Sequence, residues 1–487
     1  MTTNNYQPTE IDDGISTPPE LNIFTILRLG LFNLGVGLMA VLTLAVLNRV
    51  MITELAIPAS IAAGTLALSQ LVAPIRVWLG QLSDGKKIFG FHRTGYIRTG
   101  IVMAGVTILI AVQLVWILGT NIEVNGGWQW NPVTIGTSVG LGIIFILHGV
   151  ALSASSTPFT ALLVDISEEE TRSKIVAIIW SMLMVGIVIG GITGNVFLGS
   201  LAVGETEENP LISVADLQTP INMLFLFVAG VVVILALVGT WNIEKKYSRF
   251  HLRASNEARQ ENIGLRQALK VLTSSRQTAI FFFFLMMVTI SLFMQESVLE
   301  PYGGDVFGMG IGETTLLNSF WGVGILLGYS ATGFLVIPRI GKKNTTRIGC
   351  VLVAACFLLI IFAGLTQNEE ILKATMVLFG IAAGITTIGS LSLMLDLTVA
   401  ETAGTFVGAW GLSQAMARGI AIALGGWVLD IGKLIFGSNL WLAYSTVFFS
   451  EALVALTAIV LLNKVNIKEF KESTRKATEL VMEGDLD

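Results

Sequence analysis

The chain has 487 residues, of which 53% are hydrophobic and only 13% are charged, and its net charge at pH 7 is −5. A soluble domain carries roughly 25% charged residues, so this composition argues against a soluble protein and indicates an integral membrane protein. The two cysteines, Cys350 and Cys356, share one apolar run with no CxxC motif, which gives no basis for a disulfide or a metal site. The polar, acidic start of the chain predicts no cleaved signal peptide.

The sequence predicts twelve membrane-spanning helices. Each apolar run has about 20 or more residues, which is long enough to cross the hydrocarbon core of a membrane as a helix. The expected fold class is therefore an all-α membrane protein. The runs lie near residues 28–49, 58–80, 96–118, 133–158, 173–199, 220–243, 276–299, 313–337, 345–366, 372–396, 405–430 and 440–463.

Polar segments divide these helices into two groups of six. Residues 1–22 are expected to form a disordered cytoplasmic tail, and the basic stretch 244–275 is expected to lie along the membrane surface as a linker. The N-terminal half then covers residues 23–243 and the C-terminal half covers residues 276–463. Residues 464–487 are expected to form a second cytoplasmic tail.

Lysine and arginine concentrate in alternate connections. The other connections contain only Arg49, Lys373 and Lys433. Because basic loops stay in the cytoplasm, the pattern predicts that both termini are cytoplasmic. The basic connections and the C-terminal tail hold Lys86, Lys87, Arg93, Arg172, Lys174, the group from Lys245 to Arg276, the group from Arg339 to Arg347, Lys464, Lys468, Lys471, Arg475 and Lys476.

A short internal repeat supports the division into halves. Asp165 and Glu170 follow the fourth run in the pattern Asp-Ile-Ser-x-x-Glu-Thr, and Asp396 and Glu401 follow the tenth run in the pattern Asp-Leu-Thr-x-x-Glu-Thr. Each copy precedes a tryptophan and a glycine-rich helix. A matched order across both halves is typical of transporters built from repeats.

The segment from Gly80 to Arg98 is charged and lies between two apolar runs, so it must lie in water. Its pattern Gly-x-Leu-Ser-Asp-Gly-x-Lys resembles the loop between helices 2 and 3 of major facilitator superfamily transporters, although Gly85 stands where that family prefers arginine. The resemblance implies that Asp84 acts as a conformational latch against the N-terminus of helix 11, near Gly404, where a helix carries partial positive charge. Arg76 is expected either to pair with an acid of the 165–170 loop or to extend to the interface.

Several polar residues fall inside apolar runs, where they need partners. His148 is either a structural histidine that bonds Ser153 or Ser155, or an axial ligand to the metal of a porphyrin-like ring. Arg418 and Gln414 lie one turn apart in the eleventh run. Arg418 is either a functional residue or the partner of a helix-terminal carbonyl.

The densest polar stretch is Met294 to Asp305, at the end of the seventh run. Pro301 and two glycines predict that the helix stops there, at the external face. Glu296 and Glu300 are four residues apart and are expected to share one helical face and repel each other. Asn48, Arg49 and Glu54 hold the corresponding position in the first run.

Four stretches of the chain resemble one family closely: LNRVMITELAIPA, TPFTALLVDISEEETR, QESVLEPYGGDVFGM and DLTVAETAGTFVGAWGLSQAMARG. They are similar to signatures of the PucC-like (bacterio)chlorophyll delivery family, which are major facilitator relatives of phototrophs. The resemblance runs from about residue 25 to 463. It implies a carrier or assembly factor in a thylakoid or inner membrane that supplies (bacterio)chlorophyll to light-harvesting or photosystem apoproteins, alongside pigment-synthesis enzymes.

The pigment expected from this resemblance would be cargo and not a tightly bound cofactor. A chlorin is a flat apolar ring whose magnesium needs one axial nitrogen or oxygen ligand, so its site combines apolar walls with one polar atom. The axial candidates are His148, then Glu300, then Gln295 or Glu54. Whether the cargo is chlorophyll or bacteriochlorophyll is left open.

Two other classes of function fit the sequence less well. An ordinary proton-coupled small-solute transporter would need acids deep in the helix bundle, whereas the acids of this sequence cluster at helix ends. An enzyme is not predicted, because no nucleotide loop, metal-ligand cluster or nucleophile–base spacing stands out. Nucleic acid is not an expected partner.

Overall fold

The computed structural model describes residues 21–199, 213–248, 276–397 and 403–466. Within these ranges the regular secondary structure is helical apart from an isolated bridge between Ile88 and Phe91. Twelve of the helices are long and apolar enough to cross a membrane, as the sequence predicts. Most of them extend a few residues beyond the predicted apolar runs, because polar residues continue the helices past the hydrocarbon core.

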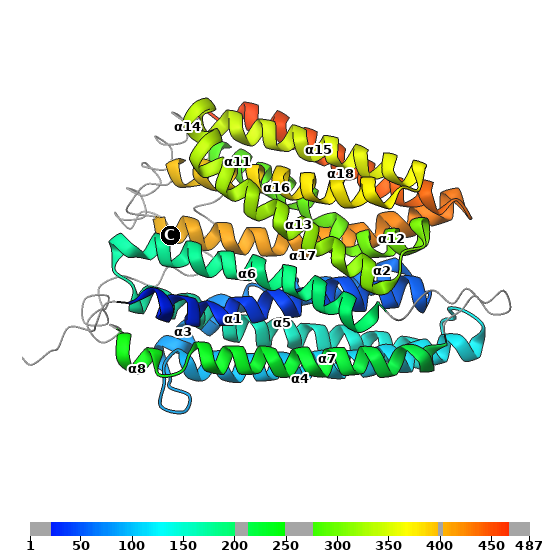
Figure 1. The fold of residues 1–487 in the computed structure, drawn as a ribbon, viewed down its shortest axis with the longest axis horizontal. Coiled ribbons are helices and arrows are strands. Elements are labelled where there is room, and N and C mark those ends of the chain that lie inside the picture. Colours follow the sequence, from blue (N-terminus) through cyan, green and yellow to red (C-terminus); the bar gives the residue numbers. More distant parts are fainter. Residues whose placement is uncertain (1–20, 200–212, 249–275, 398–402, 467–487) are drawn as a thin grey trace, which may run out of the picture.

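The N-terminal half contributes six spans, which appear from blue to green in Figure 1. The first, second and sixth spans are each built from more than one element, and the other three are single helices. Their elements are α1 (Ile23–Val41), η1 (Leu42–Leu47), η2 (Val50–Glu54), α2 (Ala59–Leu71), α3 (Ile75–Gly85), α4 (Thr94–Asn125), α5 (Pro132–Ile166), α6 (Glu169–Leu198), α7 (Val214–Gly239) and the short α8 (Ile243–Tyr247).

The C-terminal half contributes the other six spans, from green to red in Figure 1. Its elements are α11 (Arg276–Phe293), η3 (Met294–Ser297), α12 (Leu299–Phe307), α13 (Ile311–Ala331), η4 (Thr332–Val336), α14 (Ile337–Ile340), α15 (Lys342–Thr366), α16 (Glu369–Leu397), α17 (Ala403–Phe436) and α18 (Leu440–Lys464). Most of the predicted linker lies outside the described residues.

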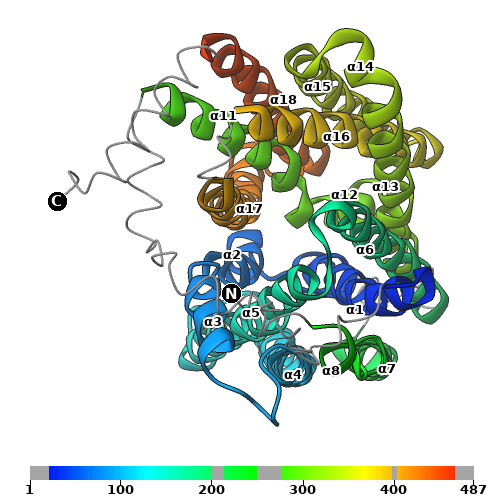
Figure 2. The same ribbon diagram turned by 90° about the vertical axis from the view of Figure 1, so that its left-hand side faces the viewer.

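The bundle has two distinct ends. We call the end that carries α8, α14 and the loop between α3 and α4 the basic end, and the opposite end the far end (Figure 1). Helix α1 begins and helix α18 ends at the basic end, as expected for an even number of spans. Figure 2 looks along the bundle from the basic end and shows the two halves as separate groups of helices.

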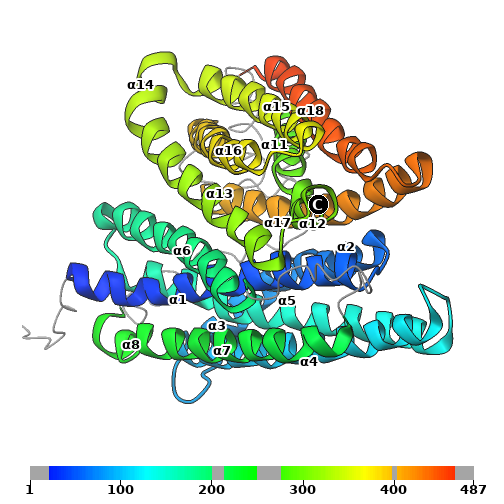
Figure 3. The ribbon, with the colours of Figure 1, turned by 45° about the vertical axis from the view of Figure 1, so that its right-hand side comes forward.

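Glycines let helices of the two halves meet closely. A Cβ atom at Gly426 of α17 would lie 2.3 Å from the carbonyl oxygen of Ala59 in α2, so only glycine fits there. Helices α13 and α6 also meet across the two halves, where Ser319 of α13 donates a hydrogen bond to the carbonyl of Val188 in α6 across 2.8 Å. In Figure 3, α13 runs from α14 toward α6, and the halves lie farther apart where α14 is.

The seventh span ends at Ser297, near the predicted end at residue 299, but the chain continues as a helix through the predicted stop signal. Pro301 and Gly303 lie inside α12, which follows a short 3₁₀ turn at Met294–Ser297. A proline in the first turn of a helix loses no hydrogen bond, because the first N–H groups of a helix have no partner inside it. The predicted stop signal therefore marks the restart of a broken helix that continues to Phe307.

Candidate functional site

Two irregular segments from opposite halves meet between the halves. The first span passes into π-helical turns, η1 and η2, over Leu42–Glu54, and the seventh span breaks at η3. Asn48 Nδ2 donates to the carbonyl of Ser297 across 2.7 Å. We call residues 42–54 and 294–300 the central junction. Breaks of this kind in spanning helices occur at transport sites, because they free backbone groups for binding.

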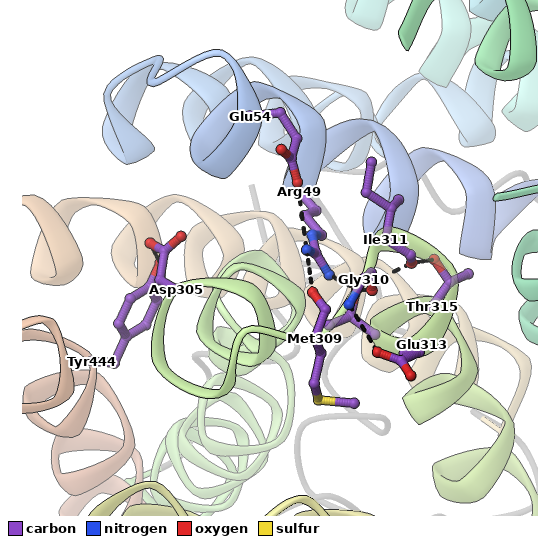
Figure 4. A network of polar contacts seen from close by, with 10 residues as sticks. Arg49, Glu54, Asp305, Met309, Gly310, Ile311, Glu313, Thr315 and Tyr444 are labelled. Atoms are coloured by element: carbon purple, nitrogen blue, oxygen red, sulfur yellow. Dashed lines mark hydrogen bonds and ion pairs between the residues drawn. The ribbon is translucent and has the colours of Figure 1, made fainter. Parts of the chain in front are cut away.

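Arg49 forms three hydrogen bonds from the N-terminal half to the C-terminal half. It is 2% exposed, and its guanidinium donates to the carbonyls of Gly310 at 2.7 Å and Met309 at 2.5 Å, and to the hydroxyl of Thr314. Glu54 lies 3.4 Å away in the same half. Figure 4 shows Arg49 reaching from the first span into the turn before α13. The guanidinium and these acceptors belong to different halves, so the hydrogen bonds form only when the halves hold this relative position.

A second link closes the far end. Both carboxylate oxygens of Asp430 in α17 accept backbone N–H groups at the start of α2, from Ala59 at 3.0 Å and from Ser60 at 2.8 Å. A carboxylate at a helix N-terminus satisfies unpaired donors and the partial positive charge there. Pro58 at the N-cap position has no side-chain acceptor, so Asp430 supplies the cap from the other half.

A third group of polar residues braces α12 inside the C-terminal half. Asp305 accepts the hydroxyl of Tyr444 at 2.6 Å (Figure 4). It also lies 3.7 Å from the ammonium group of Lys433. Glu313 accepts the N–H of Gly310 at 2.9 Å and so caps α13. These bonds hold the turn that Arg49 contacts in a fixed position.

The predicted acids of the seventh span have separate partners. Glu296 forms a bidentate ion pair with Arg418, at 2.8 and 2.5 Å, and Glu300 accepts from Asn318 Nδ2 at 2.6 Å. The prediction that both acids share one helical face is wrong, because η3 interrupts the helix between them. Arg418 also stacks over the ring of Phe293 at 4.7 Å, so its partner is a carboxylate and not a helix-terminal carbonyl.

Four buried carboxyl and amide oxygens near η3 lack a hydrogen-bond donor. They are Glu300 Oε2, Gln295 Oε1, Glu451 Oε2 and Asn48 Oδ1, and their residues are 3%, 4%, 0% and 0% exposed. Glu451 comes from α18, and its other oxygen accepts the N–H of Gln295 at 2.5 Å. Buried oxygens without donors are costly, so these positions are candidates for binding a ligand or a proton.

His148 lies away from the central junction. Its ring Nδ1 is 3.0 Å from Thr107 Oγ1 and 3.2 Å from the carbonyl of Ala104, both in α4. The predicted serine partners are therefore wrong, since α5 turns His148 toward α4. The side chain is 2% exposed and packs within the N-terminal half. This environment is that of a structural histidine in the present conformation.

Arg93 organises the basic end of the N-terminal half. It lies 2.9 Å from Asp165 and 2.5 Å from Asp84, and it donates to the hydroxyl of Ser83 at 2.6 Å. Burial lowers the pKa of the Arg93 guanidinium, but the charges of Asp165 and Asp84 outweigh it, so the pKa lies above its ordinary value. Glu244 of the short α8 caps the N-terminus of α4 in the same region, with its carboxylate 2.6 Å from the N–H of Thr94.

The residues assigned to the latch, Asp84, Arg76 and Gly80, lie at or near the basic end of the N-terminal half. Asp84 is 55% exposed and pairs with Arg93, and its contact with α17 stays a prediction. Arg76 lies 3.4 Å from the hydroxyl of Ser153, so the predicted pairing with an acid of the 165–170 loop is wrong. Gly80 packs in α3 with Thr157 as its nearest neighbour.

The internal repeat can be followed in one copy only. Asp165 bonds Arg93, whereas Glu170 and Asp396 lie in helices whose side chains are not described at those positions. Glu401 lies outside the described residues. Gln414 is half-buried in α17, one turn from Arg418.

Sequence reasoning missed Asp430, Glu451 and the role of Arg93. Glu451 is a single acid in the middle of an apolar run, and that position alone was a usable signal. Asp430 had no such signal, because only packing places it against α2.

The two six-helix halves with a polar junction between them are the fold of major facilitator superfamily transporters. The solved structure of the nucleoside transporter NupG has a TM-score of 0.62 and 14% identity, and the match covers 91% of this chain and 98% of that one. A bacterial homologue of the iron transporter ferroportin in an inward-facing state has a TM-score of 0.61 and 15% identity, with coverage of 91% and 99%. At these identities the likeness shows the fold alone.

The family model described as PUCC protein matches residues 46–470, and the chain belongs to this family. Protein PucC of Rhodobacter capsulatus is 30% identical over 447 residues, which are 90% of this chain and 92% of that protein. A protein of the same organism named bacteriochlorophyll synthase 44.5 kDa chain is 28% identical over 445 residues, with coverage of 90% and 94%. Family and fold together indicate a transporter-like integral membrane protein.

Proposed function

We propose that this protein carries (bacterio)chlorophyll in the membrane of a phototroph and delivers it to light-harvesting or photosystem apoproteins. The observation that carries the proposal is the family match over residues 46–470, joined to a relative whose printed name links it to bacteriochlorophyll. The basic loops favour an orientation with both termini in the cytoplasm. In this role the protein moves or hands over pigment and performs no chemistry on it.

The central junction is the place that best suits a pigment. Magnesium accepts oxygen ligands, and Glu300 and Gln295 each hold a buried oxygen without a donor. Glu54, 15% exposed beside Arg49, lies on the neighbouring span. This geometry favours Glu300 as the axial ligand, then Gln295, then Glu54. His148 ranks last because its ring is engaged within the N-terminal half.

Access to the junction requires a change of conformation. Glu300 and Gln295 are at most 4% exposed here, and the bonds of Arg49 and Asp430 hold the halves together on the far-end side. A transporter of this fold exposes its central site to one side at a time by rocking the halves. Pigment entry therefore goes with separation of the halves around the junction.

Pigment carried by the purified protein tests the proposal. The protein is extracted from a phototrophic host with a mild detergent, and its absorption spectrum is recorded with Glu300→Ala, Gln295→Ala, Glu54→Ala and His148→Ala variants. The exposed Glu370→Ala serves as the matched control, and circular dichroism checks folding. We expect wild type and control to carry pigment and Glu300→Ala to lose most of it. Full retention by all four variants contradicts the ligand assignment, and a colourless wild type contradicts stable pigment carriage.

A proton-coupled small-solute transporter is the second candidate. The observation in its favour is Glu451, a fully buried acid near the middle of α18, which weakens the expectation that the helix interiors lack acids. A colourless protein whose thermal stability rises with a small hydrophilic solute, and whose solute uptake into vesicles needs a pH gradient, would favour this function over the first.

A further inference from the structure

Glu451 carries a feature that neither pigment carriage nor closure of the halves explains. Its carboxyl group is 0% exposed, in the apolar stretch of α18 between Phe449 and Leu453. Placing an ionised carboxylate there without a paired cation is expensive, and acids inside spanning helices commonly serve proton or ion movement.

The hydrogen bonds around Glu451 lack one donor. Oε1 accepts the backbone N–H of Gln295, whereas Oε2 has no partner. The side-chain oxygen of Gln295 is also buried without a partner. Two unsatisfied acceptors thus belong to two residues that are already joined by a hydrogen bond. A proton on the carboxyl group is the smallest ligand that converts one acceptor into a donor.

The charges near Glu451 do not neutralise it. Glu296 of η3 is the charged side chain that acts on it electrostatically, and it has the same sign. Arg418 of α17 is already bound to Glu296 through two hydrogen bonds. The other titratable groups on the described parts of the elements packed against this part of α18 are Asp430 and Lys433 of α17, Glu300, Tyr302 and Asp305 of α12, and the thiols Cys350 and Cys356 of α15. None of them hydrogen-bonds to the carboxyl group of Glu451.

We propose that Glu451 is a proton-binding site, occupied in this conformation, whose proton is released to water when the broken seventh span moves. Release leaves a second carboxylate beside Glu296, and both then compete for Arg418. Because Glu296 lies in η3 and Gln295 N–H is the donor to Glu451, loss of the proton acts directly on the break between α11 and α12. The proposal concerns proton binding and does not depend on the identity of the cargo.

Infrared spectroscopy on pigment-free purified protein tests proton occupancy. A protonated carboxyl group in an apolar site gives a C=O stretching band that a carboxylate lacks. We expect this band at neutral pH in wild type, a weaker band in Glu451→Gln, and an unchanged band in Glu370→Gln. Glu300 is a second buried carboxyl group, so the part of the band that Glu451→Gln removes is the part assigned to Glu451. Glutamine keeps the shape and the acceptor for Gln295 N–H, so the variant should fold, as circular dichroism verifies. An unchanged band in folded Glu451→Gln overturns the proposal.

Two further measurements test whether the ligand is a proton and whether its release is coupled to the break. If sodium chloride, but not choline chloride, alters the band region at constant pH, the site binds sodium and the proposal is wrong. For coupling to the break, a Ser297→Cys reporter in a Cys350→Ala, Cys356→Ala background is alkylated at neutral and alkaline pH. Thiol reactivity itself rises with pH, so the same reporter in a Glu451→Gln protein serves as the control for that rise. We expect the reporter with Glu451 to gain more reactivity at alkaline pH, and equal gains contradict the coupling.

These outcomes are distinct from those of the pigment test. A protein that carries pigment but shows no band assigned to Glu451 keeps the proposed function and loses the proton site. A protein that shows the band but carries no pigment keeps the proton site and loses pigment carriage.

Discussion

The polar cluster on the far-end side joins the two halves to each other, whereas the polar cluster at the basic end joins helices of one half. On the far-end side, Arg49 and Asp430 bond residues of the opposite half, mostly through backbone groups. At the basic end, Arg93 binds Asp84 and Asp165, which belong to its own half. Bonds inside a half move with it as a rigid body, whereas bonds between halves exist in one conformation only. The cluster of Arg49 and Asp430 therefore stabilises one conformation of the protein. The cluster of Arg93 stabilises the N-terminal half in every conformation.

The largest effect should come from removing Arg93. Arg93→Gln removes the cation that lies 2.9 Å from Asp165, which is 5% exposed, and breaking a buried pair typically costs about 3–5 kcal/mol. We expect a lower thermal unfolding temperature with no opening of the far end, as reported by labelling of a Ser60→Cys probe. Arg172→Gln, at the same end, is the control. Greater labelling of the probe in a folded Arg93→Gln protein would contradict the division of roles.

Removing Arg49 should open the far end more than it lowers the stability of the protein. Arg49→Gln deletes charged hydrogen bonds to Met309, Gly310 and Thr314, and these bonds stabilise only the conformation in which the far end is closed. We expect the far end to open, so that the Ser60→Cys probe labels faster, while the unfolding temperature falls less than in Arg93→Gln. Arg49→Lys keeps the charge but not the fork of donors and should open the far end partly. Unchanged labelling in Arg49→Gln would show that this contact does not set the conformation.

Asp430 offers a graded version of the same experiment. Asp430→Ala removes the cap of α2 and should weaken far-end closure by about 1–2 kcal/mol. Asp430→Asn keeps one acceptor oxygen and should lose less. Labelling rates of the Ser60→Cys probe should therefore rank alanine above asparagine above wild type. An asparagine variant as open as the alanine variant would assign the whole effect to charge.

The smallest effect is expected at Asp84. In the present conformation Asp84 is more than half exposed, so Asp84→Asn should barely change stability. If Asp84 meets the N-terminus of α17 when the basic end closes, the variant loses about 0.3–1 kcal/mol of that closed state. Labelling of a Thr157→Cys probe beside Gly80 should then rise slightly. An unchanged rate would mean that Asp84 serves Arg93 alone.

The sequence predicted which polar segments form the candidate site, but it did not predict which groups bond to each other there. The sequence marked Met294–Asp305 as a polar stretch and matched it to Asn48, Arg49 and Glu54, and the structure brings Asn48 onto Ser297 and Arg49 onto Met309 and Gly310. The partners were not predictable, because carbonyl acceptors leave no signal in side-chain chemistry. Pro301 was misleading for a related reason. The missing N–H of proline breaks a helix only where a full turn precedes it, and Pro301 lies in the first turn of α12.

The sequence by itself determined the twelve spans, the division into halves and the family. Long apolar runs and short motifs encode these, since the membrane demands about 20 apolar residues per helix whatever the packing. The tertiary structure alone decided which charges meet. It turned His148 toward Thr107, placed Asp430 on the start of α2 and set Glu451 beside Gln295. Such contacts join residues up to 371 positions apart in the chain, and their geometry follows from how the helices cross.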